Sequence, residues 1–248
     1  MKALILAAGV GSRLRPLTDA LPKALIPVAG TPILERVLVR LKGAGVKSFV
    51  VNAHHHAQLV SDFCAGLSRR LGVPVSVSRE DDLLLDTGGA IRKAAPLLGG
   101  HEPFFVHNAD VLTDLDLKAL YGAHLETGAL ATLSVRARET NRAYLFDPRG
   151  RFVGHDDQSS GRTTWIKGPV AGAQRLPFDG IHVISPDLLK KITESGVFSI
   201  TKSYLRLAGS GADIRAFRGD AWSWHDIGTP EKLAAAEAWA SNFRAPRP

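Results

Sequence analysis

The N-terminal stretch MKALILAAGVGSRLRP, residues 1–16, opens with an apolar run and passes directly into a glycine loop. Residues 2–7 have the composition of a buried strand, which Gly9 ends. Gly9 and Gly11 let backbone N–H groups approach a ligand closely, because no side chain holds the ligand away. A strand that ends in such a loop predicts a phosphate site at the carboxyl edge of a parallel sheet.

The first half of the chain alternates predicted strands with predicted helices. Strands are expected near residues 49–51, 73–78 and 104–106. Helices are expected from Thr31 with Pro32 at the first position, over roughly 56–70, from Thr87 to just before Pro96, and over 115–125. This order predicts an α/β, Rossmann-like fold with a mainly parallel sheet covered by helices on both faces.

The second half follows a different pattern. Strands are expected at 131–135, 178–184 and 221–227, a helix from Pro186, and a last helix from Thr229-Pro230 to about Phe243. Residues 244–248 read as a frayed tail. The polar region 138–178 carries no helical pattern and predicts a smaller mixed β subregion that decides the substrate. No linker is long enough to divide the chain, so a single domain over 1–248 is expected.

Charge and composition narrow the class of partner. The 31 basic and 24 acidic residues give a net charge of +7, which favours anionic ligands. No basic run exceeds Arg69-Arg70, and this scatter argues against a nucleic-acid partner. The single cysteine, Cys64, excludes a disulfide within the chain and a cysteine zinc site. Without an export signal or 18 consecutive apolar residues, a cytoplasmic protein with no membrane partner is expected.

Two cations accompany the glycine loop. A P-loop would end in Gly-Lys-Ser or Gly-Lys-Thr, and a dinucleotide fingerprint would have a third glycine where Leu14 stands and an acid where Asn52 stands. The chain instead places Arg13 two residues after Gly11, with Lys23 ten residues further on. An arginine can clamp a pyrophosphate bidentately, while a lysine acts as a point charge on one phosphoryl group. The spacing therefore predicts a polyphosphate site of a third kind.

Two aspartates predict a metal site. Asp110 and Asp226 each end a predicted strand, where the sheets of α/β proteins bind ligands. Two hard carboxylates, completed by substrate phosphates, make a suitable Mg²⁺ site. His225 points to the opposite face of its strand, and Trp224 is expected to pack. The run His54–His56 begins a helix, and its side chains diverge too much for a metal site.

Several motifs resemble those of the sugar-1-phosphate nucleotidylyltransferases, also called nucleoside-diphosphate-sugar pyrophosphorylases. The strings LAAGVGSRLRPLT (6–18) and PKALIPVAGTPILE (22–35) resemble the signature of that family. Leu85-Asp-Thr-Gly-Gly-Ala90 is similar to its base-contacting segment, and Asn108-Ala-Asp110 to its Asn-Gly-Asp metal motif, with alanine replacing glycine. Trp224-His-Asp226-Ile-Gly-Thr229 resembles the motif with the second metal ligand. The resemblance runs nearly end to end and is weakest over 138–178.

The resemblance implies a role for each group of residues. Arg13, Lys23 and Asp110 are the implied catalytic residues. The implied nucleotide-binding residues are Ala8, Gly9, Gly11, Ser12, Arg13, Lys23, Glu80, Thr87, Gly88 and Gly89. The implied sugar-binding residues are Asn108, Asp110, Asp179, Gly180 and Lys167. Mg²⁺ would be held by Asp110 and Asp226, with a nucleotide-binding half at about 1–128 and a sugar-binding, metal-completing half at about 129–243.

The implied reaction joins two small molecules, an NTP and a sugar 1-phosphate, to give an NDP-sugar and pyrophosphate. The short chain and the Asp86-Thr-Gly-Gly89 form favour UTP with N-acetylmuramate 1-phosphate, a substrate of peptidoglycan recycling. Guanylyl transfer to mannose 1-phosphate, or another nucleotidyl transfer of this kind, is the alternative. A non-catalytic nucleotide-sugar sensor is more distant, since Arg13, Lys23, Asp110 and Asp226 are all present. A monomer or small homo-oligomer is expected.

Overall fold

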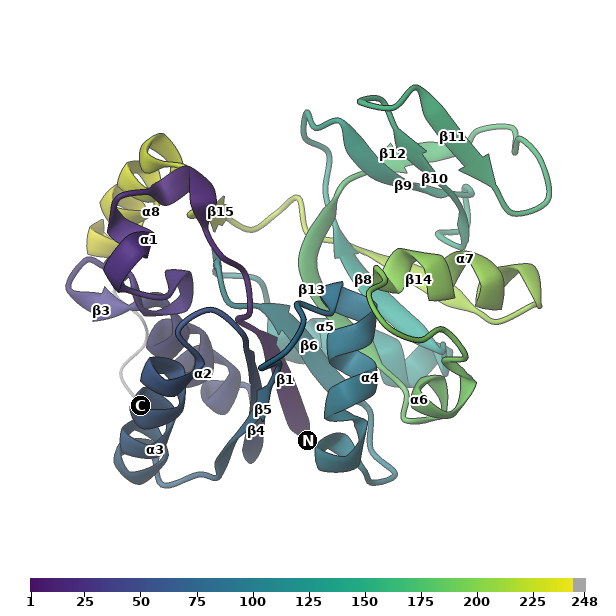
Figure 1. Cartoon of the computed structure of the whole chain (residues 1–248). Coiled ribbons are helices and arrows are strands. Elements are labelled where there is room, and N and C mark those ends of the chain that lie inside the picture. The colour runs from purple at the N-terminus through teal and green to yellow at the C-terminus, as the bar shows by residue number, and fades with distance from the viewer. Residues whose placement is uncertain (243–248) are drawn as a thin grey trace.

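A seven-stranded sheet lies at the centre of the computed structural model, which describes residues 1–242 (Figure 1). Its strand order is β14-β8-β13-β6-β1-β4-β5. The bounds are β1 Lys2–Leu6, β4 Ser48–Ala53, β5 Val75–Arg79, β6 Phe104–Asn108, β8 Ala131–Val135, β13 Phe178–Ile184 and β14 Ile214–Arg218. Strand β13 runs antiparallel to both of its neighbours, and the other pairs in this sheet are parallel. The predicted mainly parallel sheet is confirmed.

Helices cover both faces of this sheet, as the alternating pattern predicts (Figure 1). One core cluster joins the sheet to α2 (Ile33–Gly43), α3 (Ala57–Leu71), α5 (Leu117–Thr127) and α8 (Pro230–Asn242). The other joins it to α4 (Asp86–Leu98), α6 (Asp187–Lys191) and α7 (Ile200–Gly209). Helix α2 shows the local reason, since its buried residues recur on one helical face: Ile33, Leu34, Val37, Leu38 and Leu41. In the described part of the chain, no helix is long and apolar enough to cross a membrane.

The region 138–178 folds as a second, antiparallel sheet. Its strands, in the order β11-β10-β9-β12, are β9 Arg142–Phe146, β10 Phe152–Asp157, β11 Arg162–Trp165 and β12 Gln174–Leu176. Tyr144, Phe146 and Phe152 belong to the same buried cluster as Tyr204 of α7, so this sheet is fixed to the central fold by its core. The predicted smaller β subregion is therefore confirmed in its architecture.

Short elements border the carboxyl edge of the central sheet. They are η1 Ser12–Leu14, α1 Leu17–Ala20, η2 Lys23–Leu25, β2 Pro27–Val28, β3 Thr31–Pro32, β7 Val111–Thr113 and β15 Trp224–Asp226. Strands β7 and β15 pair antiparallel, with Asp226 opposite Val111. The Ile227 N–H donates to the carbonyl of Asp110 at 3.1 Å. This ladder places residues 224–227 beside residues 110–113.

The expected cap at Thr31 is wrong. Thr31 pairs with Val28 in a tight hairpin, whose two turn residues, Ala29 and Gly30, have positive φ angles of 46° and 77°. Pro32 precedes the helix, which begins at Ile33. The hairpin takes the backbone of Thr31 into a strand pair, so its hydroxyl does not cap the helix.

The helix expected to end before Pro96 continues through it to Leu98. A proline lacks the N–H that would donate to the carbonyl four residues earlier, here that of Arg92, so the last turns of the helix have one hydrogen bond fewer. Leu98 is only 2% exposed and belongs to the second core cluster, so its burial outweighs the missing bond.

Other boundaries shift, and several elements were not predicted, among them most of the short elements that border the carboxyl edge of the sheet. Helix α5 begins at Leu117 because the Asp116 side chain caps it, and the strand expected at 221–227 is limited to residues 224–226. Helix α7 and strand β14 were missed, although the buried residues of α7 recur on one helical face, at Ile200, Ser203, Tyr204 and Leu207. The last helix is described to Asn242, and the predicted end at Phe243 and the tail 244–248 lie outside the described residues.

Buried histidines make the stability depend on pH. His124 of α5 is 1% exposed, and its ring nitrogens contact the hydroxyls of Thr132 and Ser185 at 2.9 and 3.1 Å. Burial lowers its pKa from 6.5 to about 4, and burial lowers the pKa values of His107 and His182 to about 4 and about 3. Between these values and 6.5 the unfolded chain binds more protons than the folded one.

We therefore expect the free energy of unfolding to fall as the pH is lowered from about 6.5 towards 4. Above about pH 6.5 these histidines are neutral in both states, and their titration no longer changes the free energy of unfolding. Each of these histidines contributes a slope of up to about 1.4 kcal/mol per pH unit. Urea unfolding across this range, compared between the wild type and His124→Gln, measures one contribution. An equal slope in the two proteins would contradict the role of His124.

Candidate active site

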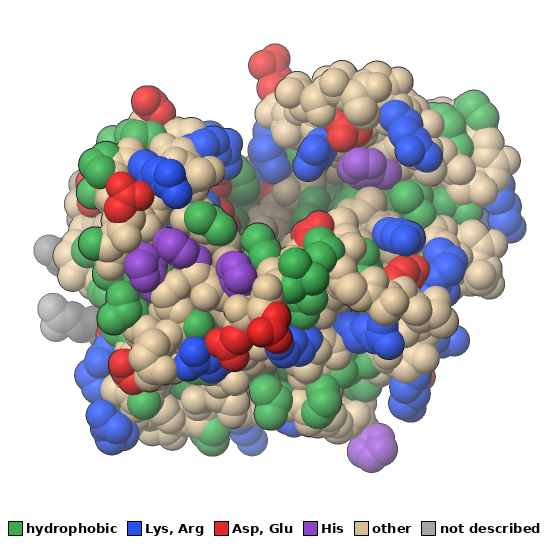
Figure 2. All heavy atoms as spheres, in the orientation of Figure 1, with side chains coloured by type: hydrophobic (Ala, Val, Ile, Leu, Met, Phe, Trp, Pro, Cys, Tyr) green, Lys and Arg blue, Asp and Glu red, His purple; other side chains and the backbone are tan. Residues whose placement is uncertain are grey.

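The carboxyl ends of β1, β4 and β6 border a cleft of about 370 Å³. Figure 2 shows the surface hollowed between the part over α1 and α8 and the part over the small sheet. The cleft is lined by Leu6, Ala7, Ala8, Gly9, Gly11, Ser12, Arg13, Lys23, Ala24, Asn52, Glu80, Leu84, Asp86, Thr87, Ala90, Asn108, Ala109, Asp110 and Gly228. The predicted phosphate-binding residues therefore share one cleft with Asp110.

The glycine loop folds back on the segment that carries Lys23. Gly11 has a φ of +69°, and a Cβ there would lie 2.9 Å from Thr18 Cγ2 and 3.2 Å from Lys23 Cβ. The Thr18 hydroxyl donates to the Gly11 carbonyl at 2.9 Å. Only glycine combines this backbone angle with such close neighbours, so Gly11 sets the distance between the loop and Lys23.

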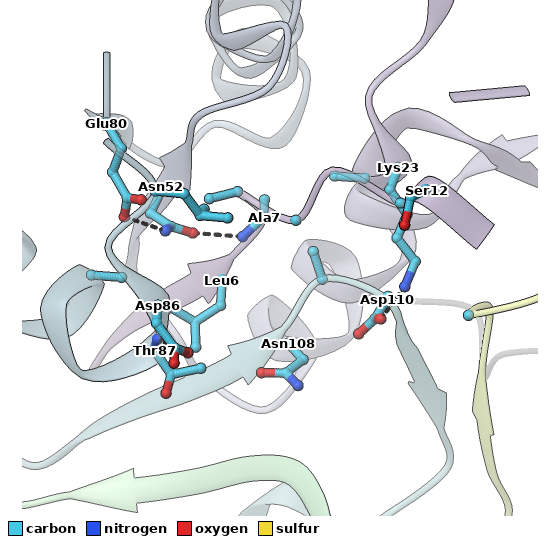
Figure 3. A pocket seen from close by; sticks show the side chains of 18 of the residues that line it. Leu6, Ala7, Ser12, Lys23, Asn52, Glu80, Asp86, Thr87, Asn108 and Asp110 are labelled. Atoms are coloured by element: carbon cyan, nitrogen blue, oxygen red, sulfur yellow. Dashed lines mark hydrogen bonds and ion pairs between the residues drawn. The ribbon is translucent and has the colours of Figure 1, made fainter. Parts of the chain in front are cut away.

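Three charged side chains meet at one end of the cleft. Lys23 forms an ion pair with Asp110, and Figure 3 shows these two side chains pointing toward one another. The Arg13 guanidinium passes close to Gly228, where a Cβ would lie 3.1 Å from its Nη2. The loop after β1, the turn after β6 and the turn after β15 thus assemble two cations and a carboxylate that are distant in sequence.

The second predicted metal ligand, Asp226, lies one strand pairing away. Its Oδ1 accepts from the Gly228 N–H at 2.8 Å, and its Oδ2 is 2.6 Å from Lys232 Nζ. Each aspartate therefore already attracts one ammonium group. Among residues 1–242, no three metal-ligating side chains gather, so a cation would need further oxygen ligands from a substrate.

A buried network, not predicted from the sequence, joins both sides of the cleft. The Asn52 side chain accepts from the Ala7 N–H at 2.6 Å and donates to Glu80 Oε1 at 2.8 Å (Figure 3). The other Glu80 oxygen accepts from the Leu85 N–H at 2.9 Å. Glu80 is 1% exposed, and through its hydrogen bond to the Leu85 N–H it fixes the backbone just before Asp86. The sequence signal that could have indicated this network is a polar residue, Asn52, at the end of an apolar strand; β4 pairs with β1 there, with Asn52 opposite Leu6.

The residues expected to contact a base divide into two groups. Thr87 lines the cleft, and its Oγ1 accepts from the Ile200 N–H at 3.0 Å. The N–H groups of Gly88 and Gly89 instead donate to the Phe198 carbonyl at 2.9 and 3.2 Å. Neither glycine is among the residues that line the cleft, and a contact between their backbone and a base stays a prediction. Their small size lets α4 approach the segment before α7.

The residues expected to contact a sugar divide as well. Asn108 lines the cleft, and Gly180 lies directly behind it, where a Cβ would be 2.7 Å from Asn108 Nδ2. Asp179 is 1% exposed and is paired with Arg136, with Nε to Oδ1 at 2.7 Å, so its carboxylate supports the fold. Lys167 lies in a separate hollow with Asp147 and Arg151, away from the cleft.

The three consecutive histidines bind backbone carbonyls. His54 Nδ1–H donates to the Glu80 carbonyl at 2.6 Å. His55 and His56 donate through Nε2–H to the carbonyls of Thr18 and Asp19, both at 3.2 Å. The run therefore ties the loop before α3 to α1, and so to the segment between Arg13 and Lys23.

Comparisons with known proteins agree with this geometry. Residues 2–146 match the model of the family described as nucleotidyl transferase. The N-acetylmuramate alpha-1-phosphate uridylyltransferase of Neisseria meningitidis serogroup B is 35% identical, and the match covers 98% of this chain and 100% of that protein. The mannose-1-phosphate guanyltransferase of Hypocrea jecorina is 30% identical over 93% of this chain, but the match covers only 62% of that protein.

A solved structure supports the fold. UDP-glucose pyrophosphorylase in complex with UDP-glucose superposes with a TM-score of 0.76 and 19% identity, covering 98% of this chain and 99% of that one. The resemblance that the sequence motifs indicate is thus confirmed at the level of the family and the fold.

The close contact of Gly88 with Phe198 can be tested by adding a single methyl group. A Cβ at Gly88 would overlap the Phe198 ring and lie 2.9 Å from its carbonyl oxygen, whereas a Cβ at Gly122, in α5, would meet nothing within 4 Å. We expect Gly88→Ala to lower the free energy of unfolding by about 1–3 kcal/mol. Gly122→Ala should leave it unchanged or raise it by up to about 1 kcal/mol. Urea unfolding of both variants measures this, and equal stabilities would contradict the packing argument.

Proposed function

Because the chain belongs to the nucleotidyl transferase family, we propose that it transfers the uridylyl group of UTP to N-acetylmuramate α-1-phosphate and releases pyrophosphate. The observation that carries this proposal is the 35% identity to a uridylyltransferase of that specificity over the whole of its length. The convergence of Arg13, Lys23 and Asp110 on one cleft supports it, because this reaction needs cations around a triphosphate.

The reaction requires no covalent intermediate. An oxygen of the sugar 1-phosphate forms a bond to the α-phosphorus, the bond from that phosphorus to the bridging oxygen breaks, and pyrophosphate leaves with the electron pair. The second pKa of a phosphate monoester is about 6, so the nucleophile is already ionised at neutral pH. The protein therefore contributes positioning and charge stabilisation rather than a general base.

The cleft residues divide this work among the phosphates. We assign the β- and γ-phosphates to the N–H groups around Gly9, Gly11 and Ser12 and to the Arg13 guanidinium. Lys23 takes the α-phosphate, since its ammonium already lies at the Asp110 end of the cleft. Ala8 and Thr87 border the space left for the base and ribose, and Asn108 that left for the ribose or the sugar.

Mg²⁺ is the proposed cofactor. Asp110 and Asp226 fit a hard cation, because both are carboxylates, they stand on neighbouring backbone segments and each already holds a positive group. When bound, the metal would supply additional positive charge to the reacting phosphates. The two aspartates would hold it, and Lys23 and Lys232 would yield part of their contact with them.

The remaining assignments follow from the same proposal. The chain acts as one domain, with a nucleotide-binding half at about 1–128 and a sugar-binding half at about 129–243, on small molecules in the cytoplasm. Its product, UDP-N-acetylmuramate, connects it with cell-wall recycling. Guanylyl transfer to mannose 1-phosphate is the second candidate, favoured by the guanyltransferase that matches 93% of this chain.

A panel of substrates tests the proposed function. Pyrophosphate release is measured for UTP, dTTP, CTP, ATP and GTP, each with N-acetylmuramate 1-phosphate, N-acetylglucosamine 1-phosphate, glucose 1-phosphate and mannose 1-phosphate. We expect the highest kcat/KM for UTP with N-acetylmuramate 1-phosphate and no turnover in EDTA. A preference for GTP with mannose 1-phosphate would replace the substrate assignment, and full activity in EDTA would contradict the metal assignment.

The two loop cations are tested by single substitutions. We expect Arg13→Ala and Lys23→Ala each to lower kcat/KM by about 10²–10³, because each removes a preorganised charge from the reacting phosphates. Arg15→Ala is the matched control, since Arg15 is on the same loop, is 64% exposed and, within residues 1–242, pairs only with Asp19, at 3.2 Å. Comparable activity in all three variants, with unchanged thermal unfolding, would remove the loop from the active site.

A further inference from the structure

Arg138, which no part of the proposed mechanism uses, stands in the connection between β8 and β9. Its guanidinium carbon lies 4.4 Å from the ring centroid of Trp224, so the cation stacks on an aromatic face. The Trp224 ring is itself fixed, because its Nε1–H donates to the Asp179 carbonyl at 2.9 Å. The platform under Arg138 is therefore rigid.

The hydrogen-bonding capacity of Arg138 is largely unused. Its Nη2 donates to the Phe178 carbonyl at 2.9 Å, while its buried Nε has no partner among residues 1–242. Arg136, two residues earlier, contrasts with it: Nε and Nη2 both contact Asp179, and Nη1 contacts the Trp222 carbonyl at 2.8 Å. Arg136 is thus a structural cation, whereas Arg138 retains donors for another group.

The position of Arg138 relates it to the cleft. Trp224 and Asp226 are two residues apart on β15, so their side chains share one face of that strand. Because Arg138 stacks on the Trp224 ring, its guanidinium lies on the same face of β15 as Asp226. Since Asp226 neighbours Asp110 through the β7–β15 ladder, Arg138 stands beside the proposed metal and sugar end of the site.

We infer that Arg138 binds an anionic oxygen group of the sugar 1-phosphate. A partly desolvated, planar guanidinium whose Nη1 donates to no group among residues 1–242 suits a carboxylate or a phosphate, and the Trp224 ring stacked on it fixes its orientation. This inference rests on the proposed function. N-acetylmuramate 1-phosphate offers two such groups: the phosphate, and the carboxylate of its lactyl ether.

The experiment compares two sugar phosphates that differ only in the lactyl ether. N-acetylmuramate 1-phosphate and N-acetylglucosamine 1-phosphate are titrated into the full chain by calorimetry, and KM and kcat are measured with UTP and Mg²⁺. The variants are Arg138→Met, which keeps an unbranched side chain over Trp224, and Arg138→Lys, which keeps the positive charge without the planar guanidinium. Arg142→Met is the matched control, because Arg142 is nearby in sequence, is 74% exposed and pairs, in the described part of the chain, only with Asp157, at 3.1 Å.

We expect Arg138→Met to weaken binding of N-acetylmuramate 1-phosphate by about 10- to 100-fold, the loss typical of hydrogen bonds to a charged group. Arg138→Lys should restore part of it, and KM should change more than kcat. An equal loss for both sugar phosphates identifies the phosphate as the bound group, and a loss confined to N-acetylmuramate 1-phosphate identifies the carboxylate.

Two outcomes would overturn the inference. If the wild type binds and converts these sugar phosphates but Arg138→Met and Arg138→Lys behave like Arg142→Met, only the role of Arg138 fails and the proposed function stands. If the wild type neither binds nor converts any sugar 1-phosphate, the proposed function fails and the inference fails with it. Thermal unfolding of every variant separates a lost contact from a lost fold.

Discussion

The antiparallel pairing of β7 with β15 is the constraint on which the rest of the site depends. This short ladder sets Asp226 opposite Val111 and brings the Ile227 N–H to the Asp110 carbonyl, so the two aspartates stand on neighbouring backbone segments. The same ladder carries Gly228 to Arg13 and presents Trp224 to Arg138. One backbone pairing therefore lies next to the proposed metal ligands, to the arginine proposed to bind phosphate and to the residue inferred to bind the sugar substrate.

The two sides of the cleft are connected by buried polar bonds rather than by apolar packing alone. The Asn52 side chain accepts a hydrogen bond from the Ala7 N–H, at the start of the glycine loop, and donates one to Glu80. Glu80 in turn accepts from the Leu85 N–H, just before Asp86. Burial makes such bonds costly to break, because each unpaired group would lose its partner without gaining water. These hydrogen bonds connect the glycine loop to the segment before Asp86 across the cleft, and such preorganisation would favour the proposed in-line reaction between two bound molecules.

Much of the site could be predicted from local sequence. The loop glycines and their two cations could be recognised because a bound polyphosphate requires both close backbone approach and positive charge, and the structure places Arg13 and Lys23 in one cleft. The roles of Gly88 and Gly89 could not be recognised in this way. A glycine serves a ligand or a neighbouring segment equally well, and only the fold shows that Phe198 occupies that place. The same limit applies to Lys167 and Asp179, since a charged residue type does not reveal whether its partner is a substrate, an arginine or water.

What the sequence alone determined is whatever depends on neighbours along the chain: the strand entering a glycine loop, the alternation that predicts a covered parallel sheet, and the cation spacing that suits a triphosphate. These properties follow from backbone sterics, periodicity and charge, which act over a few residues. The tertiary structure decided which further segments meet, namely the β7–β15 pairing beside Asp110, the Asn52–Glu80 hydrogen bond and the stacking of Arg138 on Trp224. Such contacts arise from sheet order and register, and a single sequence does not encode these in any local pattern.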